Sequence, residues 1–141
     1  MGKNGAWAFN VSVCADTDRQ VSYDNMPSTD SFLFNSNRHV TLVDLSGMNS
    51  VRMLVNKQAV AANAGAKLSL KYCETYSTNP ADYQDIGASP VEIAIDCENS
   101  FLQSEWTQIV APQNDVFVAV IGSGGDGATS PEFGHISLNF S

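Results

Sequence analysis

Residues 118–140 read VAVIGSGGDGATSPEFGHISLNF, and four glycines lie between Gly122 and Gly127. Such a run is typical of three structures: a phosphate-binding loop, a metal-binding loop, or a turn between two strands. Phosphate-binding loops lead into a helix, and a Walker loop also needs a lysine followed by serine or threonine. Here no lysine follows, and HISLNF (135–140) alternates as a strand does. The stretch therefore predicts a glycine turn between strands, with a contact to a neighbouring subunit and a ligand or metal loop as alternatives.

Strand-like segments recur along the rest of the chain, with turn residues between them. They are AWAFNVSV (6–13), HVTLVDL (39–45), SVRMLV (50–55), AKLSLKYCE (66–74), VEIAIDCE (91–98), WTQIVA (106–111), DVFVAVIG (115–122) and FGHISLNF (133–140). Helical periodicity is nearly absent. This spacing predicts an all-β fold, an antiparallel β-sandwich of about eight strands, rather than strands joined by crossover helices.

One segment, VFVAVI (116–121), is apolar at every position. An alternating strand has only one apolar face, so this pattern indicates a strand that is covered on both faces. The cover can come from the same chain, which predicts a central strand, or from a second subunit.

Two stretches lack strand patterning. Residues 15–31 are polar and rich in aspartate, and residues 76–89 contain proline and glycine. Both are predicted to be long surface loops, and long ordered loops often carry function.

The length of 141 residues favours one domain. We expect a single β-sandwich domain over residues 1–141. Residues 1–6, which include two glycines, are predicted to form a flexible N-terminal arm.

The charge of the chain argues against two classes of partner. The formal net charge is −8, and the 7 lysines and arginines are scattered along the sequence. Binding to nucleic acid or to an anionic membrane requires clustered cations. We therefore expect neither nucleic acid nor membrane as a partner.

The N-terminal residues 1–13 lack the apolar core of a signal peptide, and no run of apolar residues is long enough to span a membrane. The cysteines are Cys14, Cys73 and Cys97. Their odd number and irregular spacing predict reduced, buried thiols rather than a disulfide framework or a zinc site.

No pattern of catalytic residues is present. His39 and His135 lie on predicted strands without a nucleophile motif, and Glu92 and Glu105 have no sequence relation that pairs them. Two acidic pairs, Asp16 with Asp18 and Asp82 with Asp85, lack the remaining ligands of an EF-hand loop. We expect no enzyme activity, no metal and no cofactor.

Trp7 and Trp106 are the two tryptophans. Each can anchor the core or its rim, and each can also form a platform on which a sugar ring stacks.

Taken together, VDLSGMNSVRMLV (43–55), AKLSLKYCE, VEIAIDCENS, EWTQIV and the glycine-rich last connection resemble the jelly-roll capsid decoration (cement) proteins of tailed bacteriophages. The similarity covers about residues 39–141, and it lies in strand order, in the Arg52 to Val55 strand and in the Pro131-marked last connection. Carbohydrate-binding modules share the sandwich, and a fold alone does not settle function.

The resemblance implies a jelly-roll sandwich and a non-enzymatic role on the outer capsid surface of a virion, after synthesis in the host cytoplasm. It implies the major capsid protein and the chain itself, as a homotrimer, as partners. Partner contacts are then expected at Gly122, Gly124, Gly125, Asp126, Gly127, Asp16, Asp18, Met26 and Pro27. The first alternative is a carbohydrate-binding module or adhesin-type receptor-binding domain that uses Trp7 and Trp106. The second is a structural subunit of another complex.

Overall fold

The computed structural model describes residues 9–12, 21–22, 31–32, 40–57, 65–125 and 132–141. Within these residues the chain forms twelve strands and one short 3₁₀ helix. The strands are β1 (Phe9–Ser12), β2 (Val21–Ser22), β3 (Ser31–Phe32), β4 (Val40–Asp44), β5 (Ser50–Lys57), β6 (Lys67–Cys73), β7 (Gln84–Asp85), β8 (Val91–Ala94), β9 (Phe101–Gln103), β10 (Thr107–Gln108), β11 (Asp115–Ser123) and β12 (Glu132–Phe140). The helix is η1 (Pro80–Asp82).

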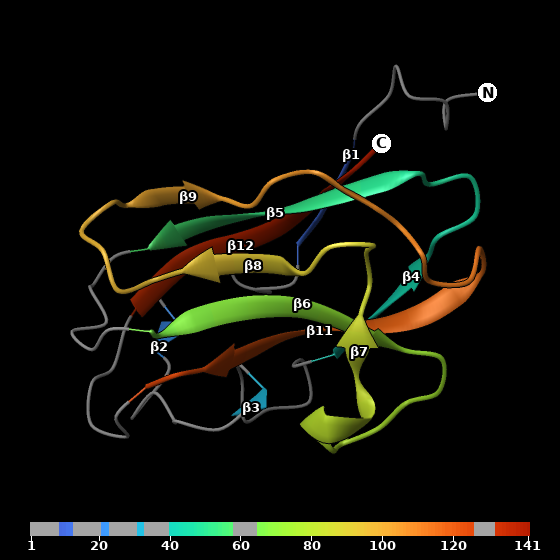
Figure 1. The fold of residues 1–141 in the computed structure, drawn as a ribbon, viewed down its shortest axis with the longest axis horizontal. Coiled ribbons are helices and arrows are strands. Elements are labelled where there is room, and N and C mark those ends of the chain that lie inside the picture. The colour runs from blue at the N-terminus through green and yellow to red at the C-terminus, as the bar shows by residue number, and fades with distance from the viewer. Residues whose placement is uncertain (1–8, 13–20, 23–30, 33–39, 58–64, 126–131) are drawn as a thin grey trace.

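The strands form two antiparallel sheets (Figure 1). Sheet A contains β1 and β2 beside β12, then β5, then β9 and β10. Sheet B contains β3 and β4 beside β11, then β6, then β7 and β8. In four places two strands lie one after the other along the same side of a longer strand: β1 and β2 on β12, β3 and β4 on β11, β7 and β8 on β6, and β9 and β10 on β5. If each such pair is counted as one position, the twelve strands occupy eight positions.

The eight positions follow a jelly-roll order. Successive positions alternate between the two sheets, except that β6 is followed within sheet B by β7 and β8. The predicted all-β fold, the sandwich and its number of strand positions are therefore confirmed.

Two predicted strands are shorter than expected. The segment 91–98 leaves sheet B after Ala94, where the Ile95 amide donates to the Ala66 carbonyl. The segment 106–111 pairs with β5 only at Thr107 and Gln108. Beyond that point the Val110 amide donates to the Ile86 carbonyl, so the chain is already crossing toward the other sheet.

Four short strands were not predicted. They are β2, β3, β7 and β9, none longer than three residues. Of these, β2 and β3 fall within or at the end of the predicted loop 15–31, and β7 falls within the predicted loop 76–89. Strands of two or three residues carry too little alternation to be read from sequence.

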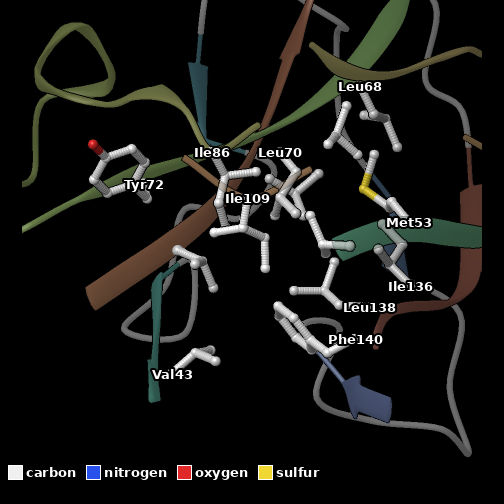
Figure 2. Packing of buried hydrophobic residues seen from close by; sticks show 14 of the residues in the cluster. Val43, Met53, Leu68, Leu70, Tyr72, Ile86, Ile109, Ile136, Leu138 and Phe140 are labelled. Atoms are coloured by element: carbon white, nitrogen blue, oxygen red, sulfur yellow. The ribbon is translucent and has the colours of Figure 1, made fainter. Parts of the chain in front are cut away.

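The main core lies between the sheets (Figure 2). Met53 of β5 and Leu138 of β12 contribute from sheet A, and Leu68 and Leu70 of β6 contribute from sheet B. All four are completely buried. Ile86 also enters this core from the connection after β7.

The apolar strand β11 is covered on both faces by its own chain. Val116, Val118 and Val120 point into the main core. On the opposite face Ala119 and Ile121 pack with Phe32 and Tyr83, whose rings meet edge to face at 5.4 Å. The first of the two predicted explanations for VFVAVI, a central strand, is therefore correct.

The loop that supplies Tyr83 is closed by local hydrogen bonds. The Tyr83 hydroxyl donates to the Ser77 carbonyl at 2.9 Å. The Asn79 side chain accepts from the Ala81 amide and caps η1. Tyr76 adds an edge-to-face contact with Phe117 of β11. These contacts hold residues 76–83 over the outer face of sheet B.

The glycine-rich stretch begins where two backbone segments pack closely together. Gly122 belongs to β11, and Gly124 has a φ of 78°. A Cβ atom on Gly124 would lie 2.1 Å from the carbonyl oxygen of Gly65, so backbone meets backbone there. Gly124 thus adopts the left-handed backbone conformation that glycine tolerates without strain.

Candidate interaction surface on sheet A

The outer face of sheet A is defined by β5. Val51, Met53 and Val55 are buried in the core, so Arg52 and Leu54 point the other way. The register places neighbouring side chains from β9 and β12 beside them. We call this surface the Arg52 face; it consists of Arg52, Leu54, Phe101, Gln103, Trp106 and Asn139.

Arg52 is held by three neighbours. Its Nε donates to Oδ1 of Asn139 at 3.0 Å, and its Nη1 donates to Oε1 of Gln103 at 3.2 Å. Its Cζ lies 4.8 Å from the centroid of the Trp106 ring, within the range of a cation–π contact. The guanidinium is therefore fixed by amide oxygens and an aromatic face, and none of these partners carries a charge.

Ser104 explains why β9 and Trp106 stay close to β5. The Met53 amide donates to the Ser104 Oγ at 2.9 Å, and the Ser104 amide donates to the Met53 carbonyl at 2.9 Å. These two bonds hold the connection between β9 and β10 against β5, at a point where neither strand pairs with β5.

Thr107 fixes the other side of Trp106. Its Oγ1 donates to the Ser89 carbonyl at 3.1 Å and accepts from the Ser89 amide at 3.0 Å. The fit is close, because a Cβ atom on Gly87 would lie 2.2 Å from the Thr107 Cγ2. Trp106 thus stands between two anchored residues, which limits the movement of its backbone.

The Arg52 face has an apolar side. Phe101 is 78% exposed, and Trp106 is 42% exposed. Leu54, Phe101, Leu102 and Gln103 line an open depression of about 290 Å³. An apolar patch bordered by polar side chains, here Arg52 and Gln103, is a feature of surfaces that contact a partner.

The predicted contact residues do not gather at the Arg52 face. Gly122, Gly124 and Gly125 lie at the end of β11 in sheet B, where Gly122 and Gly125 are buried. Trp106 does lie on the face. The other predicted residues lie outside the part of the chain that the structure describes: Trp7, Asp16, Asp18, Met26, Pro27, Asp126 and Gly127.

Asp82 and Asp85, the acidic pair within the described residues, do not gather into a metal site. Asp82 accepts from the Ser77 hydroxyl, and Asp85 lies on β7. The described residues contain no cluster of three or more histidine, cysteine, aspartate or glutamate side chains that is placed to hold a metal ion. Cys73, half-buried on β6, is a free thiol, so no Cys73–Cys97 bridge forms. In the described part of the chain, no helix is long and apolar enough to cross a membrane.

Sequence reasoning missed Gln103, Phe101 and Asn139 as members of one surface. The alternation in SVRMLV is enough to place Arg52 and Leu54 on the face of the strand that points away from the core. The partners of Arg52 come from positions 51 and 87 residues further along the chain, and only the strand register brings them together.

Comparison with protein-family models, curated proteins and solved structures gave no match.

Proposed function

We propose that this chain is a non-enzymatic virion structural protein, a capsid decoration protein that binds the outer surface of an assembled phage head. The observation that supports the proposal most directly is the Arg52 face. It combines a fixed arginine with an exposed tryptophan and an exposed phenylalanine. Arginine and tryptophan are enriched among the residues that dominate the energy of protein–protein interfaces.

The mechanism follows from mass action. A protein that binds the assembled shell but not the free shell subunits stabilises the assembled state. At a concentration one hundred times its Kd, each bound site adds about 2.7 kcal/mol. The partner in this proposal is the major capsid protein.

Self-association into a homotrimer belongs to the same proposal. Within the described residues, β4 pairs only with β11, so its other edge carries no described strand. Leu42 on this strand is 57% exposed. Natural sheets cover such edges, and closed symmetry is the common way to do so between copies.

Reconstitution tests the function directly. Purified phage heads assembled without this chain are heated with and without added protein, and the release of packaged DNA is measured. We expect the protein to sediment with the heads and to raise the temperature at which they open. Failure of the wild-type chain to bind the heads would exclude the decoration role.

A carbohydrate-binding module remains the second candidate, because Trp106 is a partly exposed aromatic ring beside polar side chains. Binding of the wild-type chain on a glycan array, abolished by Trp106→Ala, would favour this function.

A further inference from the structure

The Arg52 face offers several hydrogen-bond donors to a ligand. A guanidinium has five N–H donors and no acceptor, and two of the five are engaged with Asn139 and Gln103, which leaves three. The Gln103 oxygen is turned toward Arg52, so its amide NH₂ group is left as a further donor, and the residue is exposed.

No carboxylate in the described part of the chain lies within salt-bridge distance of this arginine. The described salt bridge joins Lys67 to Glu92 at 3.2 Å, and both residues belong to sheet B. Arg52 is therefore a half-buried cation that is oriented but not paired with a carboxylate among the described residues. A carboxylate is the complementary ligand, since it only accepts hydrogen bonds and can receive a guanidinium through two parallel bonds.

The apolar depression sets the second feature of the ligand. Leu54 is the next outward position after Arg52 on β5, and Gln103 both bonds Arg52 and lines the depression. Alternate residues of an extended strand are about 7 Å apart. A partner segment in extended conformation can therefore place a carboxylate at Arg52 and an apolar side chain, two residues away, at Leu54 and Phe101.

From this geometry we propose that the Arg52 face docks an extended acidic–x–apolar segment of a protein, with an aspartate or glutamate at Arg52 and an aliphatic or aromatic side chain in the depression. The inference rests on the proposed function, in which that protein is the capsid shell. The composition of the face favours a protein over a glycan, because the depression is bordered by Leu54, Leu102 and the exposed Phe101.

Binding to heads tests the two halves of the docking site. Full-length wild type, Arg52→Met, Phe101→Ser and Lys71→Met are titrated onto heads assembled without this chain, and the bound fraction is measured by sedimentation. Arg52→Met should weaken binding roughly 30-fold or more, and Phe101→Ser about tenfold. Lys71→Met removes one positive charge on sheet B and should change binding by less than about twofold. Melting curves show whether each variant is folded.

A second measurement identifies the group opposite Arg52. Arg52→Lys keeps the positive charge and introduces an amine that a carbodiimide can join to a neighbouring carboxylate. Mass spectrometry of cross-linked heads should find position 52 joined to an aspartate or glutamate of a shell peptide, with an apolar residue two positions away.

The outcomes separate the inference from the function on which it rests. If wild type fails to bind heads, the decoration role is wrong. If wild type binds and folded Arg52→Met and Phe101→Ser bind equally well, the role stands and the docking site lies elsewhere. A bound Arg52→Lys variant that gives no cross-link excludes the carboxylate. If a glucuronic acid oligosaccharide competes with heads for binding to the wild-type chain, the ligand of the Arg52 face is an acidic sugar rather than a protein segment.

Discussion

At the scale of single residues, Gly124 shows how the glycine-rich stretch is used. Its positive φ disfavours a side chain, and its contact with the Gly65 carbonyl leaves no room for a Cβ atom. The glycine therefore stabilises the fold of the single chain, whatever role the neighbouring residues have in contacts with partners. Gly65 also has a positive φ, of 91°, but a Cβ atom there would meet no atom within 4 Å.

This difference gives a matched pair of substitutions. Gly65→Ala introduces only backbone strain and should lower the free energy of unfolding by about 1 kcal/mol. Gly124→Ala adds a clash with backbone and should lower it by roughly 2–4 kcal/mol. Denaturant unfolding of both variants measures the values. Equal losses would mean that the Gly124–Gly65 contact relaxes at no cost.

Two buried tyrosines make stability depend on alkaline pH. Burial raises the pKa of Tyr83 and of Tyr72 above the ordinary value of 10.0, and Glu74 and Cys73 raise that of Tyr72 further. Both hydroxyls therefore keep their protons in the folded state at a pH where the unfolded chain loses them. Their contribution to stability is complete below about pH 10 and is lost as the pH rises through the folded-state pKa values.

We expect the denaturant midpoint to fall above about pH 10, in step with tyrosinate absorbance of the unfolded chain. Tyr83→Phe should reduce the slope of this fall, although it also removes the bond to Ser77. A midpoint that does not change with pH in this range would contradict the assignment.

At the scale of elements, the segment from β9 to β10 is tied to β5 by the Ser104 side chain as much as by strand pairing. Replacement of the hydroxyl leaves the buried Met53 amide without its acceptor. Such a loss costs about 1–3 kcal/mol.

Ser104→Ala should therefore destabilise the fold by that amount and, since it loosens the segment that carries Trp106, also weaken binding to heads. Ser100→Ala, an exposed position just before β9, is the control and should change neither quantity. Differential scanning calorimetry and the sedimentation assay report the two effects. Unchanged hydrogen exchange at Met53 in Ser104→Ala would show that the serine is dispensable.

The elements also show what the sequence could and could not reveal. Long alternating segments such as AKLSLKYCE predicted β6 well, because seven paired residues fix one face in the core. FLQ at β9 is too short to alternate and depends on β5 and Ser104 for its place. The Arg52 face could be predicted only in part, because its six residues come from three separate regions that meet through register.

At the scale of the whole molecule, the proposed homotrimer is a prediction that purified protein can test. Light scattering at micromolar concentration should give three times the chain mass of 15.1 kDa. Leu42→Lys places a charge on the exposed edge strand β4 and should shift the mass toward the monomer if that edge is buried between copies. A monomeric wild type would remove the trimer from the proposal.

The pairing of β1 with β12 places Phe9 opposite Phe140. The first described strand of sheet A therefore cannot complete its pairing until Phe140 has left the ribosome. Until then β5 also lacks its longest partner, since it pairs with β12 over most of its length. Folding dominated by such distant pairings is slow and leaves strand edges open to aggregation. We expect a folding time in the range of milliseconds to seconds. We also expect the nascent chain to depend on chaperones until residue 140 has left the ribosome.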